Sequence, residues 1–170
     1  MSTSVLPILR NVKISFRLNL DNCRSVLESE ASKVTTSYLI FKKDKYTFSI
    51  FRKSNTVNVT GLPDFTHVIP AFEQFLTLSA ISYSPSIYIK IDNTTVNGQF
   101  PYKFNFTLLR ESQCIAHYNP SVFPGCVLTL PNGIKSIIFK SGKYIIVGCK
   151  SELHINESFN FLCSIVQKLQ

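Results

Sequence analysis

The hydrophobic and polar positions of this chain alternate most clearly near its C-terminal end. Three short runs rich in β-branched residues lie there, at about 126–130, 135–140 and 143–149. Pro131-Asn132-Gly133 and Ser141-Gly142 separate them, and Asn-Gly and Ser-Gly between such runs are strong hairpin signals. Apolar residues then recur with helical spacing from 151 to 169, and Ser151 is a good N-cap. The pattern predicts a meander of three strands followed by a helix.

The earlier part of the chain shows the same kinds of element. Helices are predicted over 21–32, with Asp21 as cap and Val26 and Leu27 facing inward, and over 106–117. A third is predicted over 65–78 after the cap Asp64, and Pro70 should weaken or kink it. Strands are predicted at 6–17, 35–42, 46–52, 56–60 and 87–95, the last of them continuing at 100–104 beyond a turn at Asn97-Gly98.

The predicted order of elements occurs twice, which indicates a tandem duplication. The two copies are about 1–82 and 83–170. Residues that match between them lie about half a chain length apart: Asn11 with Asn93, Ile50-Phe51 with Ile138-Phe139, Gly61 with Gly148, His67 with His154 and Phe72 with Phe159.

A duplicated unit of this kind predicts an α+β fold. Each half supplies antiparallel strands with helices on one face only, and joined edge to edge the halves would form one curved sheet. The predicted helices would cover its convex face and leave the concave face bare. A bare sheet face is either polar or a binding surface.

Composition narrows the class of protein. The chain has 170 residues, 45% of them apolar, which is typical of a folded globular protein. No apolar run approaches the length of a membrane span, and the N-terminus does not resemble a secretion signal. The five cysteines form no C-x-x-C pair, so we expect buried thiols of an intracellular protein rather than disulfides or zinc ligands.

Charge and motifs point to binding rather than catalysis. The net charge of +8 favours a polyanionic partner, either nucleic acid or an acidic membrane surface. Gly142-Lys143 lacks the rest of a phosphate-binding loop, and Cys114 near His117 is only a generic adjacency. We therefore expect no enzyme activity, no cofactor, no metal and no small-molecule substrate.

Several segments resemble the TATA-binding protein family. YNPSVFPG at 118–125, IIFKSGK at 137–143 and VGCK at 147–150 are similar to the second-repeat signature of that family. PILRN at 7–11 and SIFRKSNTVNVTG at 49–61 resemble its first repeat more faintly. The resemblance covers residues 7–169, with no long insertion.

The resemblance implies a saddle that binds and bends the minor groove of A·T-rich promoter DNA, as a transcription initiation factor in the nucleus or another intracellular site of transcription. The implied partners are double-stranded DNA and general transcription factors or RNA polymerase subunits, with no membrane. The implied contacts are wedges at Phe51, Phe123 and Phe139, central contacts at Asn11, Asn93, Thr60 and Val147, and phosphate contacts at Lys143 and Lys150.

The first half departs from the family pattern. No phenylalanine stands near 34–36, where the fourth wedge is expected. Lys13, Ser49 and Asn58 replace apolar residues of the predicted concave face, whereas Ile137 and Ile145 keep it apolar in the second half. The alternative function is therefore a scaffold of the same fold that has lost DNA binding and acts through protein partners.

Overall fold

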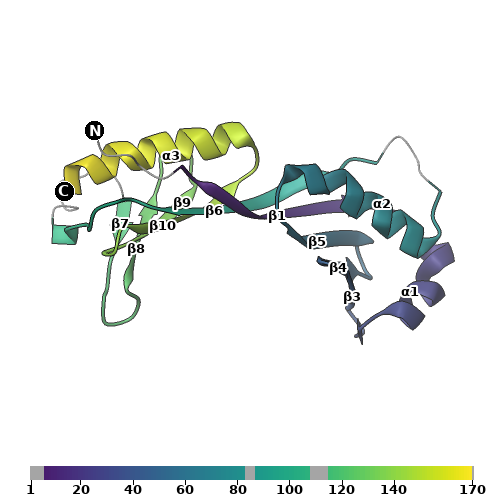
Figure 1. Ribbon diagram of the computed structural model, residues 1–170. Coiled ribbons are helices and arrows are strands. Elements are labelled where there is room, and N and C mark those ends of the chain that lie inside the picture. Colours follow the sequence, from purple (N-terminus) through teal and green to yellow (C-terminus); the bar gives the residue numbers. More distant parts are fainter. Residues whose placement is uncertain (1–5, 83–86, 108–114, 170) are drawn as a thin grey trace. The chain divides into compact units, whose positions relative to one another are not determined.

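The computed structural model describes residues 6–82, 87–107 and 115–169. It divides into two compact units (Figure 1). The first unit is Asn11–Asp92, and the second is Asn93–Gln170 together with Met1–Arg10. Each unit contains an antiparallel sheet with helical cover on one face. These units do not test the predicted repeat boundary at 82/83, which stays a prediction.

In the first unit, helix α2 packs across the sheet. Val12, Ile14 and Phe16 alternate along β1 and are fully buried or nearly so. The rings of Phe72 and Phe75 in α2 lie 4.9 and 5.3 Å from the ring of Phe16. The elements are β1 (Ile8–Arg17), α1 (Arg24–Glu30), β2 (Lys33–Val34), β3 (Tyr38–Lys43), β4 (Tyr46–Phe51), β5 (Thr56–Leu62) and α2 (Val68–Ser79), with short 3-10 turns at Asp21–Cys23 and Phe65–His67 and strand order β2-β3-β4-β5-β1.

In the second unit, α3 lies along the sheet in the same way (Figure 1). The buried ring of Tyr144 in β10 lies 5.0 Å from Phe100 and 5.7 Å from Phe159 of α3, and these rings form the centre of the core. The elements are β6 (Lys90–Gln99), β7 (Ile115–His117), β8 (Gly125–Thr129), β9 (Lys135–Phe139), β10 (Lys143–Cys149), α3 (Glu152–Val166) and a 3-10 turn at Gln167–Leu169, with strand order β6-β10-β9-β8-β7.

The meander and the helix caps agree with the sequence patterns. β8, β9 and β10 lie at the predicted positions and pair with one another in antiparallel register. The Ser151 hydroxyl accepts a hydrogen bond from the His154 N–H at 3.2 Å, and the Asp64 carboxylate accepts one from the Thr66 N–H at 2.9 Å. The hydrogen bonds that Thr66 donates to the Asp64 carboxylate hold the pKa of this carboxyl group below its usual value.

Three predictions in the second unit are wrong: the helix over 106–117, the turn at Asn97-Gly98 and the strand at 100–104. The helix expected over 106–117 does not reach its predicted end, because Ile115–His117 form β7 and pair with β8; residues 108–114 lie outside the described residues. β6 runs straight through Asn97-Gly98 without a turn. Gly98 is needed there because a Cβ would overlap the ring of Tyr144. The strand expected at 100–104 is absent because Pro101 has no N–H for a ladder.

Three details of the first unit also differ from the prediction. The helix expected over 21–32 begins as a 3-10 turn and ends at Glu30, and Val26 is 46% exposed rather than inward. The strand expected at 35–42 begins only at Tyr38, as β3, because a turn at 35–37 separates it from the two-residue strand β2. Pro70 is the third residue of α2, in the first turn, where a missing N–H costs the helix no hydrogen bond.

The cysteines that the structure describes are free thiols, as expected. Cys23, Cys126 and Cys149 are buried and Cys163 is half-buried. Burial raises the pKa of the Cys126 thiol to about 11, so this thiol stays protonated at neutral pH. Within the described ranges, no three His, Cys, Asp or Glu residues are grouped to hold a metal ion. Among the same residues, no helix has the length and apolar character needed to cross a bilayer.

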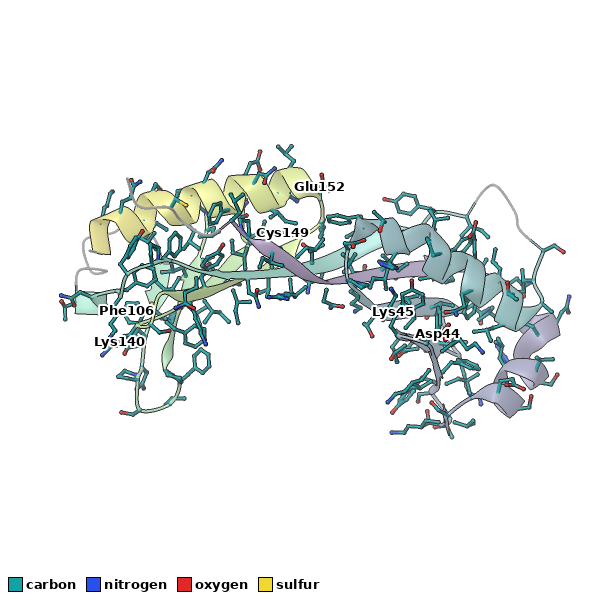
Figure 2. All side chains as sticks on the ribbon, in the orientation of Figure 1. Asp44, Lys45, Phe106, Lys140, Cys149 and Glu152 are labelled. Atoms are coloured by element: carbon teal, nitrogen blue, oxygen red, sulfur yellow. The ribbon has the colours of Figure 1, made fainter. Side chains whose placement is uncertain are left out.

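Replacing Gly61 by alanine should destabilise the protein more than replacing Gly148. Both glycines have positive φ, +89° and +104°, so alanine strains the backbone at each. At Gly61 the methyl group would also overlap the backbone oxygen of Lys45, which Figure 2 labels, whereas the surroundings of Gly148 leave room for it. We expect losses in the free energy of unfolding of about 2–4 kcal/mol for Gly61→Ala and about half that for Gly148→Ala. Urea unfolding measures both, and equal losses would contradict the steric argument.

Candidate nucleic-acid interface

The predicted contact residues lie on the sheet face opposite the helices, which we call the open face of each unit. Strand positions that alternate with the buried core residues point to this face. In the first unit it carries Asn11, Phe51 and Thr60, and in the second it carries Asn93, Phe139, Lys143 and Val147, with Phe123 just before β8 and Lys150 just after β10.

Each unit has a β-bulge at a glycine on this face. The register between β1 and β5 shifts between Val12 and Ile14, opposite Gly61. The register between β10 and β6 shifts between Val147 and Cys149, at Gly148. A bulge leaves one residue without its ladder partner, so the glycine N–H needs another acceptor.

An asparagine side chain supplies that acceptor in both units. The Asn11 Oδ1 accepts a hydrogen bond from the Gly61 N–H at 3.2 Å, and the Asn93 Oδ1 accepts one from the Gly148 N–H at 2.6 Å. Because the amide oxygen faces the backbone, the amide Nδ2 is left as a donor, and within the described part of the chain it donates to no other group. Sequence matching paired these two asparagines, and the structure shows that they share one local geometry.

The second unit carries an exposed aromatic pair. Phe123 is 41% exposed, and its ring lies 6.0 Å from that of Phe139 with the planes at 68°. Gly125, the cross-strand partner of Phe139, makes this arrangement fit, because a Cβ there would overlap Phe123 and Ile137. Packing of the Phe123 ring therefore explains why the Phe-Pro-Gly sequence ends in glycine.

The first unit also has an aromatic pair, which sequence matching missed. Phe51 is 39% exposed, and the ring of Tyr38 lies 6.4 Å from it. Tyr38 is the cross-strand partner of Phe51, so it holds the position that Gly125 holds in the second unit. A ring is therefore present although no phenylalanine stands near 34–36. The pairing register of β3 and β4 was the signal that could have found it.

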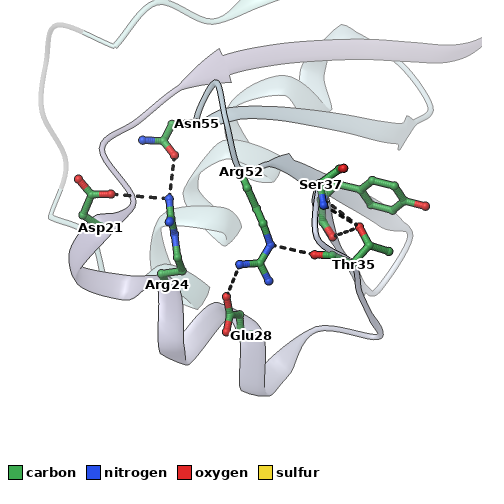
Figure 3. A network of polar contacts seen from close by, with 8 residues as sticks. Asp21, Arg24, Glu28, Thr35, Ser37, Arg52 and Asn55 are labelled. Atoms are coloured by element: carbon green, nitrogen blue, oxygen red, sulfur yellow. Dashed lines mark hydrogen bonds and ion pairs between the residues drawn. The ribbon is translucent and has the colours of Figure 1, made fainter.

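A polar network supports this pair (Figure 3). The Arg52 guanidinium lies 2.6 Å from the Glu28 carboxylate of α1 and donates to the Thr35 carbonyl at 2.9 Å. The Thr35 hydroxyl oxygen in turn accepts hydrogen bonds from the N–H groups of Ser37 and Tyr38. The partly exposed ion pair contributes only about 1 kcal/mol or less. Its effect is mainly to fix the turn at 35–37 beside the aromatic pair.

The open faces of the two units differ in chemistry between the asparagine and the aromatic pair. Ser15, Asn58 and Ser49 lie side by side in β1, β5 and β4. The corresponding positions of the second unit are Asn97 in β6, Ile145 in β10 and Ile137 in β9. Lys13 adds a charge to the open face of the first unit. Lys13, Ser49 and Asn58 therefore lie on the open face of the first unit, as the sequence predicts.

The two predicted phosphate contacts are available for binding. Lys143 and Lys150 are both exposed, and neither forms an ion pair with a described residue. Thr60 and Val147 are half-buried beside the bulge glycines. A cationic margin around amide donors and aromatic rings is a surface suited to a nucleic acid groove.

Comparison with known proteins agrees with this geometry. Residues 88–169 match the family described as transcription factor TFIID, or TATA-binding protein (TBP). Over these residues, just under half of the chain, the sequence is similar to the TATA-binding protein family. That family is described as a transcription factor, in agreement with the expectation of a binding protein rather than an enzyme.

Two curated relatives of the TBP family show the extent of the sequence match. The TATA-box-binding protein of Pyrodictium occultum is 31% identical over 90 residues, which are 51% of this chain and 45% of that protein. The one from Pyrobaculum islandicum is 28% identical over 79 residues, 46% of this chain and 40% of that protein. The match therefore spans less than half the length of these relatives.

The solved TBP of Methanococcus jannaschii shows the fold of the whole chain. It superposes with a TM-score of 0.80 over 97% of this chain and 100% of its own, at 24% sequence identity. The predicted α+β TBP-like fold is therefore confirmed. The likeness in fold extends over the first unit, where the family match in sequence does not reach.

Two substitutions of Asn93 should show how much its amide oxygen stabilises the bulge, separately from the amide donor that faces outward. Asn93→Asp keeps an oxygen for the Gly148 N–H, whereas Asn93→Leu removes it. We expect Asn93→Leu to lower the free energy of unfolding by about 1 kcal/mol and Asn93→Asp by less. Thermal or urea unfolding of the two variants provides the measurement. A larger loss for Asn93→Asp would mean that the hydrogen bond does not support the bulge.

Proposed function

We propose that this chain is a TBP-like transcription initiation factor that binds and bends the minor groove of A·T-rich promoter DNA. The observation that carries the proposal is the pair of bulge asparagines, Asn11 and Asn93, each of which accepts a backbone hydrogen bond and presents its amide donor on an open face. The minor groove of A·T pairs offers only acceptors, adenine N3 and thymine O2, which suit such donors.

The remaining residues of the open faces fit the same role. Phe139 with Phe123, and Phe51 with Tyr38, form aromatic pairs with one exposed and one half-buried ring, of a kind that can enter between base steps and unstack them. Lys143 and Lys150, with the net charge of +8, supply attraction to phosphates.

The protein partners and the site of action follow from this role. We propose that the chain works with general transcription factors or RNA polymerase subunits and acts where transcription takes place, in a nucleus or an equivalent compartment. The similarity to TATA-box-binding proteins supports this assignment.

A second candidate function is a TBP-like scaffold that acts only through protein partners. The polar open face of the first unit favours it, because Lys13, Ser49 and Asn58 stand where an apolar groove floor is expected. The retained asparagines and aromatic pairs weigh against it. The two functions differ in whether the chain binds duplex DNA at all.

Binding to an A·T-rich duplex should weaken linearly with salt on a log–log scale, because phosphate contacts release counterions. Lys143→Ala and Lys150→Ala should each lower the slope by about one unit without changing sequence preference. Lys168→Ala, an exposed lysine in the turn after α3, is the matched control and should leave the slope unchanged. A flat salt dependence of the unmodified protein would favour the scaffold.

Bending should depend most on Phe139. The approach to this ring is apolar through Ile137 and Ile145, so contact made after unstacking can offset the few kcal/mol that unstacking costs. The approach to Phe51 passes Ser49 and Asn58. Energy transfer across end-labelled duplexes should therefore show a larger loss of bend for Phe139→Ala than for Phe51→Ala. Leu153→Ala, exposed on α3, should change nothing. Equal losses at both rings would contradict this asymmetry.

A further inference from the structure

Resting on the proposed DNA binding, we propose that the first unit tolerates G·C base pairs in the half of the site that it contacts. The residues responsible are Ser15, Asn58 and Ser49, which we call the polar row. This property would make the chain a reader of sites that are A·T-rich in one half only.

The polar row is set by strand register. Ser15 of β1 is the cross-strand partner of Asn58 of β5, and Asn58 is the partner of Ser49 of β4. All three are half-buried on the open face of one sheet. Strands lie about 4.8 Å apart, so the row spans roughly 10 Å. That length corresponds to about three base pairs at 3.4 Å each.

The oxygens of the polar row are free to accept. Neither the two hydroxyl groups nor the Asn58 amide forms a hydrogen bond with any residue in the described part of the chain. A serine hydroxyl and an asparagine carboxamide each carry an acceptor oxygen as well as a donor. The row can therefore pair with donors or acceptors on a groove floor.

Acceptor oxygens on the open face matter for guanine, because guanine is the base with a hydrogen-bond donor in the minor groove. In the minor groove, A·T and T·A pairs present only acceptors, whereas a G·C pair adds the guanine N2 amino donor. Covering that amino group with apolar side chains leaves a buried donor without a partner, which lowers affinity by about tenfold or more. A row of oxygens removes most of that loss.

The second unit has no acceptor at two of the three matching positions, and the third is already engaged in one hydrogen bond. Ile145 and Ile137 are apolar, and Val127 continues the same row into β8. Asn97, which corresponds to Ser15, already accepts a hydrogen bond on its Oδ1 from the Arg10 guanidinium at 2.9 Å. The second unit should therefore reject guanine, and the two open faces differ in the base pairs that they allow.

Four duplexes test the proposal with the full chain: one all A·T, one with three G·C pairs in one half, one with them in the other half, and one with them in both halves. Because the two units share one fold plan, the protein can choose its orientation, so G·C in either half alone should cost less than about threefold in affinity. G·C in both halves should cost about tenfold or more. Inosine in place of guanine lacks the amino group and should restore binding to the last duplex.

Variants of the polar row make the test specific. Asn58→Ile with Ser49→Ile copies the second unit, and should raise the ratio of affinity for the all-A·T duplex over that for the duplexes with G·C in one half by about tenfold or more. Ile145→Asn with Ile137→Ser makes the reverse exchange and should accept G·C in both halves. Circular dichroism and a cooperative unfolding transition show that each variant is folded, independently of DNA binding.

The outcomes separate this inference from the proposed function. If the unmodified protein binds the all-A·T duplex but loses tenfold or more with G·C in either half, the inference is overturned and the proposed function stands. A loss that inosine does not restore comes from duplex stiffness and also overturns it. Absence of binding to every duplex overturns both.

Discussion

The proposed binding surface depends on one hydrogen bond that occurs in each unit, donated by the N–H of a bulge glycine to an asparagine side chain. The bulges at Gly61 and Gly148 remove a ladder partner, and the oxygens of Asn11 and Asn93 replace it. This hydrogen bond fixes the orientation of the side-chain amide before any ligand binds, with its oxygen toward the backbone and its NH2 group away from it. The amide is therefore pre-organised, and binding need not pay for orienting it.

The two faces of each sheet are under different constraints. On the covered face, Phe16 and Phe48 in the first unit and Tyr144 in the second fit against helix rings, and any change there must preserve packing. On the open face a side chain meets solvent or a ligand, so the first unit can hold Asn58 where the second holds Ile145 without loss of the fold. The differences in chemistry between the two units therefore lie on the open faces, where the proposed binding would take place.

Much of the fold could be predicted from the sequence, because its signals are local. Asn132-Gly133 and Ser141-Gly142 fix the hairpins, and Ser151 caps α3 through its own hydroxyl. The errors come from contacts distant in sequence. The sequence predicts a turn at Gly98, but this residue lies in strand β6, where a glycine is required because a Cβ would overlap the ring of Tyr144. The site residues were matched by order alone, and Tyr38 was missed because only the register with Phe51 reveals it.

Tyr38 in the first unit stands at the position that corresponds to Gly125 in the second unit, and this difference has a physical consequence. In the second unit the absent Cβ lets the Phe123 ring fold over the strand beside Phe139. In the first unit Tyr38 places its own ring beside Phe51, and a ring arriving from position 36 would have to occupy the same volume. Tyr38 therefore supplies beside Phe51 the second ring that Phe123 supplies beside Phe139, although no phenylalanine stands near 34–36. The hydroxyl that Tyr38 brings makes this pair more polar than the pair of phenylalanines, in the same direction as Ser15, Asn58 and Ser49.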